Sequence, residues 1–157
     1  MPDKIRLAPS DAVIGDTMAY EEEGEIGYWK INGFASWDIE AARSGGYDVY
    51  MLASCGENQG GTGCIETPCG SYEFTVYETA SFSNYHYICC KGVRLREGKQ
   101  KFKIQPVRLK QIFFMALREV IILPEGAAFD KPTLAVDIPR RRAALSKGMH
   151  KMYASKG

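Results

Sequence analysis

The chain has 157 residues, of which 45% are hydrophobic and 25% are charged. These are values of a globular protein, and they exclude a disordered, collagen-like or coiled-coil chain. The amino end lacks the apolar segment of a signal peptide, so we expect an intracellular protein, with cytoplasm, cytoskeleton and organelle left open. No apolar stretch approaches the roughly 20 residues of a membrane helix, so we expect no membrane partner.

The net charge of +1 conceals two regions of opposite charge. Residues 140–157 hold six Lys and Arg residues and no acid, whereas residues 1–139 hold 14 basic and 19 acidic residues, a net charge of −5. A basic tail on an acidic body predicts an acidic partner, with a solvated chain end as the alternative. The tail residues that we expect to bind such a partner are Arg140, Arg141, Arg142, Lys147 and Lys151.

Alternation of apolar and polar residues predicts a series of strands in the central region. The glycine-rich stretch 56–63 is interpreted as a long hairpin loop between two of them. Many short strands without a convincing helix predict an all-β fold, namely an antiparallel β-sandwich of the jelly-roll kind. In chain order, the expected strands are 18–23, 26–31, 36–42, 46–53, 71–78, 84–95, 99–105 and 112–123.

The two ends of the chain differ from this central region. We expect an N-terminal arm at 1–16, the sandwich domain at 17–124 and a basic C-terminal extension at 125–157. The extension starts with a proline-punctuated, extended part and continues into a segment with apolar residues at helical spacing, which predicts a short helix. Its apolar face either docks on another surface or packs back on the sandwich. The residues at this spacing are Leu145, Met149, Met152 and Tyr153.

Metal binding has weak support in the sequence. The five cysteines are an odd number, so reduced thiols are the expectation, and the spacing of Cys64 and Cys69 does not fit a zinc site. Glu21 and Glu23 share one face of the first expected strand and are candidate calcium ligands. An exposed acidic strand is the alternative, and no other cofactor is expected.

Catalysis has no support in the sequence. Only His86 and His150 are available as proton shuttles near neutral pH, and there is no GxSxG, HExxH or P-loop motif. Because no pair of nucleophile and base can be named, we expect a protein that is not an enzyme.

Several short motifs follow one another along the chain, among them Tyr20-Glu21-Glu22-Glu23, Ile26-Gly27-Tyr28-Trp29, Ala35-Ser36-Trp37-Asp38-Ile39-Glu40, Gly45-Gly46-Tyr47-Asp48-Val49, Thr79-Ala80-Ser81-Phe82 and Met115-Ala116-Leu117-Arg118. In this order and spacing they resemble the galactose-binding-like jelly rolls, specifically carbohydrate-binding modules of the family 6 and 35 type. Similar modules are appended to bacterial sulfatases and fucosidases. The resemblance covers roughly residues 17–124.

The resemblance implies a sugar site on loop aromatics. The positions that match the family's aromatic pair are Tyr28 or Trp29, and Phe82 or Tyr85. The family often has an Asn or Asp in the last strand that contacts a sugar hydroxyl or helps to hold calcium. This chain has Met115-Ala116-Leu117-Arg118 there, so that polar contact is missing and calcium loses a ligand.

Two functions remain. The first is a non-catalytic module that serves as a structural or interaction subunit of a larger assembly, whose basic tail docks on an acidic protein lattice or an RNA-containing particle. The second is a lectin-like, carbohydrate-binding module that stacks a sugar on loop aromatics. The departures of this chain from the family pattern favour the first function as the expectation.

Overall fold

The computed structural model describes residues 4–15, 18–20 and 24–139. In this part of the chain the structure consists of strands, loops and one 3-10 turn at Pro9–Asp11. All five cysteines are free thiols. No helix among the described residues is long and apolar enough to cross a membrane.

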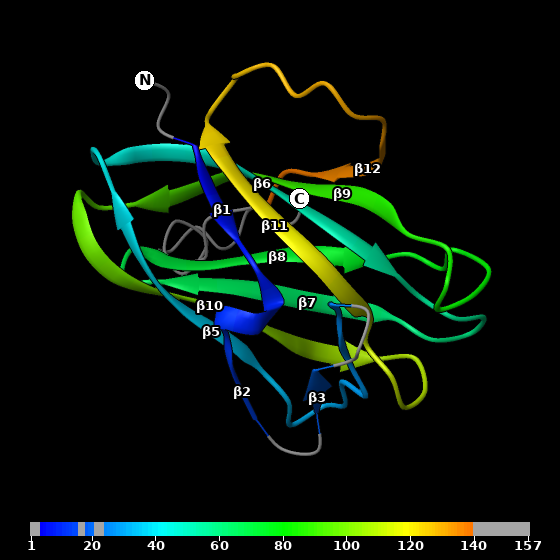
Figure 1. The fold of residues 1–157 in the computed structure, drawn as a ribbon. Helices are drawn as coiled ribbons and strands as arrows, with labels where there is room; N and C mark the ends of the chain where they lie inside the picture. Colours follow the sequence, from blue (N-terminus) through cyan, green and yellow to red (C-terminus); the bar gives the residue numbers. More distant parts are fainter. Residues whose placement is uncertain (1–3, 16–17, 21–23, 140–157) are drawn as a thin grey trace, which may run out of the picture.

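The strands of the described residues form two sheets that pack face to face (Figure 1). The larger sheet has seven strands in the order β12-β9-β6-β11-β4-β3, with β1 also paired to β11. All of its pairs are antiparallel except β12 with β9, which is parallel. Its strands are β1 (Ile5–Leu7), β3 (Ala19–Tyr20), β4 (Ile26–Gly27), β6 (Gly45–Ser54), β9 (His86–Leu95), β11 (Ala116–Pro124) and β12 (Thr133–Asp137).

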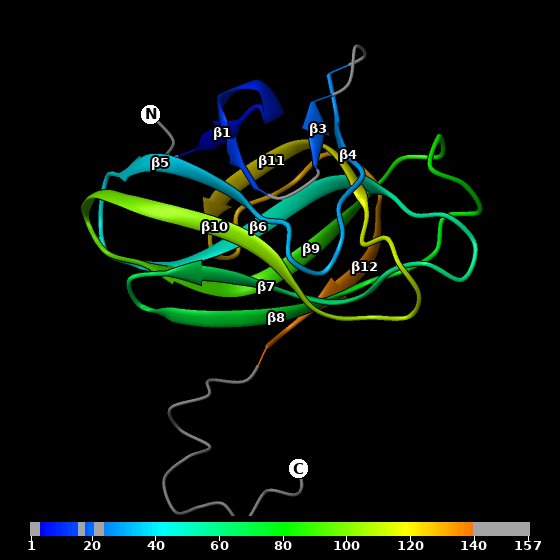
Figure 2. The ribbon, with the colours of Figure 1, turned by 90° about the horizontal axis from the view of Figure 1, so that it is seen from below.

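The smaller sheet has five antiparallel strands in the order β2-β5-β10-β7-β8. Figure 2 shows the loops that follow β6, β8 and β10 gathered at one end of the sandwich. The expected all-β sandwich is therefore confirmed. The strands of this sheet are β2 (Val13–Ile14), β5 (Ala35–Ala41), β7 (Gly61–Thr67), β8 (Gly70–Val76) and β10 (Gly98–Leu109).

The core lies between the sheets, and the alternation of the sequence places it there. In β5, Ala35, Trp37, Ile39 and Ala41 are buried while the residues between them are more accessible. Trp37 lies opposite Phe102 of β10, and their rings contact at a centroid distance of 6.3 Å. Cross-strand aromatic pairs of this kind stabilise a sheet and fix its register.

Strand β7 corrects one prediction, since it occupies part of the stretch that the sequence indicated as a hairpin loop. The loop is confined to the residues before Gly61, and the glycines of β7 are strand residues. A Cβ at Gly63 would collide with the ring of Phe114. Glycine in a strand marks such a close approach, and here it conceals the strand in the sequence.

The sandwich also extends beyond residues 17–124. Strands β1 and β2 lie in the expected N-terminal arm, and β12 lies in the expected C-terminal extension. β12 pairs with β9, and the Asp137 carboxylate accepts a hydrogen bond from the Thr75 backbone N–H of β8 at 3.0 Å. This contact ties the extension to both sheets. The predicted tail helix lies outside the described residues.

A second, smaller apolar cluster covers the outer face of the larger sheet. The segment between β11 and β12 arches over this face (Figure 1), and Phe129 stacks on Tyr50 at a centroid distance of 3.9 Å. The base of the arch is fixed by the buried carboxylate of Asp48, which accepts hydrogen bonds from Lys91 Nζ at 2.9 Å and from the Gly126 N–H at 3.0 Å. The hydrogen bond with Asp48 raises the pKa of Lys91.

Candidate functional site

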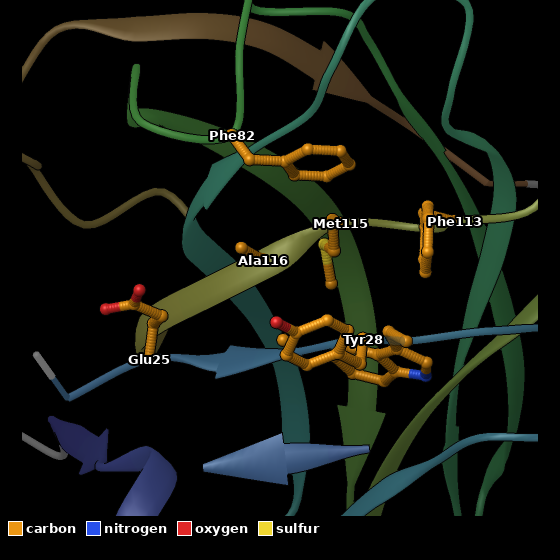
Figure 3. Close-up of a pocket in the computed structure, with 8 residues that line it drawn as sticks. Glu25, Tyr28, Phe82, Phe113, Met115 and Ala116 are labelled. Carbon is orange, nitrogen blue, oxygen red and sulfur yellow. The ribbon is translucent and has the colours of Figure 1, made fainter. Parts of the chain in front are cut away.

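A pocket of about 330 Å³ lies at the end of the sandwich where β4 ends and β11 begins (Figure 3). Its volume is at the lower end of the range for small-molecule sites, roughly 300–1,000 Å³. Its walls come from segments that are far apart in the chain, namely β4, the loop after β8 and the loop after β10. The residues that line it are Glu25, Gly27, Tyr28, Trp29, Phe82, Phe113, Met115 and Ala116.

Tyr28 forms one wall of the pocket in an unusual backbone conformation. Its φ angle is 56°, in the left-handed region, and its side chain is 59% exposed. This conformation costs a non-glycine residue roughly 1–2 kcal/mol. The next residue holds it in place, because Trp29 is fully buried, packs edge to face on Phe114 at 5.1 Å and accepts the Phe114 N–H at its carbonyl at 2.8 Å. Strain of this kind gathers at binding and catalytic sites.

Phe82 forms the opposite wall, on the loop between β8 and β9. Its ring is 38% exposed and meets Phe113 edge to face at a centroid distance of 6.2 Å. Hydrogen bonds fix the loop, since Ser54 Oγ donates to the Phe82 carbonyl at 2.8 Å and Thr79 Oγ1 accepts from the Cys55 N–H at 2.9 Å. The aromatic wall is thus held in position before any ligand arrives.

The floor of the pocket is apolar. Figure 3 shows Tyr28 and Phe82 on opposite sides, with Met115 and Ala116, at the point where β11 begins, between them. Both floor residues are buried. The resemblance implied an Asn or Asp side chain at this position, and the chain has these two apolar residues there instead.

Glu25 places a carboxylate at one end of the pocket (Figure 3). Its side chain is 17% exposed, and its Oε1 accepts no hydrogen bond from any described residue. Arg118 Nε lies 3.7 Å from this oxygen, within range of an ion pair but too far for a hydrogen bond. The Arg118 guanidinium itself lies over the ring of Tyr85, 4.1 Å from the centroid.

The structure brings two of the four predicted aromatic residues together as ring walls, Tyr28 and Phe82. Trp29 is buried beneath the site and offers no free ring face, because its indole fills the core. Tyr85 is not among the residues that line the pocket and instead packs on Arg118. The carboxylates of Glu21 and Glu23 lie outside the described residues, as do the tail residues Arg140, Arg141, Arg142, Lys147 and Lys151.

The sequence-based reasoning missed two further contributors, Glu25 and Phe113, and it identified Met115 and Ala116 only as the place of a missing polar contact. Glu25 directly precedes the Ile26-Gly27-Tyr28-Trp29 motif, which was the available signal for it. Phe113 lay in a long apolar run that predicted only a buried strand, whereas it belongs to the loop before β11.

The chemistry of the described residues does not resemble that of a metal centre or an activated nucleophile. No group of three or more His, Cys, Asp or Glu side chains among them is placed to hold a metal ion. The described residues therefore give no support to a calcium site. Burial raises the pKa of the Cys55 thiol, next to the pocket loops, to about 11, and that of Cys89 to about 11 as well. Thiols of this kind stay protonated near neutral pH and react poorly.

No protein-family model matches the chain, and no curated protein matches it in sequence. Solved structures do match its fold. A family 35 carbohydrate-binding module from Clostridium thermocellum superposes with a TM-score of 0.65 at 11% identity, over 76% of this chain and 98% of that module. A carbohydrate-binding module of Cellvibrio mixtus lichenase 5A in complex with cellotriose gives 0.61 at 16% identity, over 80% of this chain and 100% of that module.

The fold also occurs within a larger enzyme. An exo-β-1,3-galactanase from Phanerochaete chrysosporium, with β-1,3-galactotriose, gives a TM-score of 0.63 at 12% identity over 76% of this chain. The match spans only 29% of the length of the galactanase chain. At such identities these likenesses establish the fold, which is that of the family 35 and family 6 carbohydrate-binding modules.

These matches correct the function that the sequence favoured. We expected a structural or interaction subunit of a larger assembly, with a basic tail docked on an acidic lattice or an RNA-containing particle. The matched structures described above are two carbohydrate-binding modules and an exo-β-1,3-galactanase. The prediction was wrong because it relied on the charge of 18 tail residues, which indicates only that an acidic partner is possible. The structural match covers 76% of the chain and includes the sandwich that carries the pocket. The sugar-binding alternative is the better supported of the two.

Proposed function

We propose that the chain is a non-catalytic, carbohydrate-binding module and that its ligand binds in the pocket between Tyr28 and Phe82. The observation that carries this proposal is the pair of partly exposed rings on opposite sides of an apolar floor (Figure 3). The C–H-rich faces of a sugar ring pack well against such aromatic surfaces. The strained backbone of Tyr28 supports the same assignment, since it holds a large apolar ring out in solvent.

The polar contacts available to the sugar are few. Glu25 is the one acidic side chain among the described residues of the lining, and it can accept a hydrogen bond from a sugar hydroxyl. Met115 and Ala116 offer none. With stacking as the main contribution, we expect a dissociation constant in the millimolar range, about −4 kcal/mol of binding free energy.

Three finer expectations accompany this proposal. The module serves a larger glycan-processing protein, as the modules appended to sulfatases and fucosidases do. Calcium bound through Glu21 and Glu23 and an intracellular location stay predictions from the sequence.

The test is a titration of the isotope-labelled chain with neutral oligosaccharides, followed by NMR. Tyr28→Ala and Phe82→Ala should each weaken binding about tenfold, since a stacked ring contributes about 1.4 kcal/mol or more. Tyr77→Ala is the matched control, because Tyr77 is also an exposed tyrosine but does not line the pocket. Equal affinities for Tyr28→Ala, Phe82→Ala and Tyr77→Ala would contradict the proposal.

A further inference from the structure

We infer that the pocket selects its sugar by charge and prefers one that carries a protonated amino group. The inference rests on the proposed function and adds a substrate class to it, namely oligosaccharides of hexosamines with free amines. Neutral sugars bind more weakly in this scheme, and uronic acids bind least.

The first observation is the state of the Glu25 carboxylate. It lies at the end of the pocket, mostly shielded from water, and its Oε1 accepts no hydrogen bond from the described residues. A shielded acceptor without a donor costs free energy until a ligand supplies one. Arg118 Nε lies 3.7 Å from this buried oxygen, close enough to compensate part of the charge but too far to donate a hydrogen bond to it.

The second observation is the set of ring faces around the site. Tyr28, Phe82 and Phe113 line the pocket, and the face of an aromatic ring attracts cations. Two rings at this end of the molecule already hold cations, since Lys30 Nζ lies 5.9 Å from the Phe113 centroid and the Arg118 guanidinium lies over Tyr85. No described residue of the lining carries a positive charge. A cation inside the pocket therefore meets aromatic faces and a carboxylate, which attract it, and no lining group that repels it.

The balance of interactions then ranks the ligands. A hydroxyl gives Glu25 a hydrogen bond with one charged partner, whereas an ammonium group gives a bond in which both partners are charged, which is stronger. A uronate carboxylate would instead face a like charge in a shielded site. Because Arg118 already neutralises part of the Glu25 charge, we expect a preference of about tenfold for the amino sugar, at the modest end for a partly shielded pair.

The experiment uses oligosaccharides that differ only in the charged group. Cellotetraose and the β-1,4-linked glucosamine tetramer share one backbone, and a galactosamine oligomer with its galactose counterpart forms a second pair. Binding is followed by NMR at a pH of about 5.5, where the amines of the hexosamine oligomers are mostly protonated. An oligoglucuronate is the anionic ligand of the panel.

The variant Glu25→Gln removes the charge while the shape of the side chain is kept, so the ratio of the affinities for the glucosamine tetramer and cellotetraose should fall from about ten to about one, whatever happens to the affinity for cellotetraose itself. Glu57→Gln is the matched control, because Glu57 is an exposed acid on the loop after β6 that does not line the pocket. It should keep the full preference. If Glu25→Gln fails to fold, the wild-type chain provides the test. Its preference for the amino sugar over the neutral sugar should decrease as NaCl is raised to about 0.5 M, because salt screens the interaction of the two charges.

The outcomes separate this inference from the proposed function. Neutral and amino sugars that bind equally in both pairs, or a preference that survives in Glu25→Gln, would overturn the inference and leave sugar binding intact. If no sugar of any class shifts the resonances of the pocket, the proposed function itself fails and the inference fails with it.

Discussion

Two regions of the molecule carry nearly the same side chains and use them differently. The outer cluster beneath the arch between β11 and β12 combines Tyr50, Tyr87 and Phe129 with the carboxylates of Asp48 and Glu119. The pocket combines Tyr28, Phe82 and Phe113 with the carboxylate of Glu25. Composition alone therefore does not distinguish a structural cluster from a binding site.

The difference lies in how far each group is satisfied within the chain. In the outer cluster the rings stack on each other, and each carboxylate accepts hydrogen bonds from two or more donors. Asp48 accepts from Lys91 and Gly126, while Glu119 accepts from Arg6 and Tyr87. In the pocket, Tyr28 and Phe82 lie on opposite sides and Glu25 Oε1 accepts no hydrogen bond from the described residues. Groups that are satisfied stabilise the fold, and groups that are left open indicate a ligand.

The largest expected effect is on the structural side, at Asp48. Asp48→Ala should lower the free energy of unfolding by about 3 kcal/mol, because it removes a buried acceptor and leaves the Gly126 N–H without its partner. Removing one partner of a buried ion pair costs roughly 3–5 kcal/mol. We expect the lower value here because the Lys91 side chain is 34% exposed and can be hydrated in the variant. Urea unfolding measures the change, and sugar affinity should stay the same. A loss below about 0.5 kcal/mol would show that the arch contributes little to stability.

The next effect compares a phenylalanine from each region. Phe129→Ala should destabilise the chain by about 2 kcal/mol, less than a fully buried phenylalanine, because its ring is half-buried. Phe82→Ala should cost less than about 1 kcal/mol, since Phe82 is more exposed, and should instead weaken sugar binding. The comparison uses thermal unfolding and titration of both variants. If Phe129→Ala weakened sugar binding and Phe82→Ala mainly lowered stability, the distinction between the two regions would be wrong.

A smaller effect is expected at Tyr28. Tyr28→Asn should leave the free energy of unfolding unchanged or raise it by up to about 1 kcal/mol, because asparagine tolerates the left-handed conformation better than tyrosine does. The same substitution should remove stacking on Tyr28 and weaken sugar binding about tenfold, as Tyr28→Ala does. Clear destabilisation of Tyr28→Asn would mean that the ring serves the fold rather than a ligand.

The smallest effect is a pH dependence from Glu119. Burial raises the pKa of Glu119, but hydrogen bonds from Tyr87 and Arg6 outweigh this and hold its pKa below the usual value. A carboxyl with a lowered pKa in the folded state contributes stability above the unfolded pKa, about 4.3, and that stability is lost as the pH falls through the lower folded pKa. Tyr87→Phe removes one of these hydrogen bonds. The free energy of unfolding, measured by urea unfolding, should therefore depend less on pH between a pH of about 5 and 3. An unchanged slope would exclude this contribution.

The sequence predicted the fold well wherever alternation was clean. Strands β5, β8 and β10 bury every second residue over most of their length, and nearly all of these residues are apolar, which determines both the strand and its buried face. β7 was missed because it begins Gly-Thr-Gly, and glycine is typical of loops rather than strands. At Gly63 the structure needs a glycine because the ring of Phe114 lies too close for a Cβ. β12 was missed because it is short and carries exposed Leu134 and Val136, so its sequence has no buried face to mark it as a strand.

The site was predictable in part. Tyr28 and Phe82 followed from the resemblance, but the sequence does not distinguish Tyr28 from the neighbouring Trp29. That choice depends on a backbone angle at Tyr28 that turns one ring outward and the next into the core. Glu25 gains its role from Arg118, which is distant in the chain and is brought near it by the antiparallel pairing of β4 with β11.

One NMR experiment tests the central claim most directly. The chain is titrated with cellotetraose and the glucosamine tetramer, and the backbone resonances of both regions are followed together. We expect saturable shifts at Gly27, Trp29 and Ala116 around the pocket, and no shifts at Ala127 and Phe129 in the outer cluster. Saturable shifts confined to the outer cluster would contradict the account, as would the absence of any saturable shift at high ligand concentration.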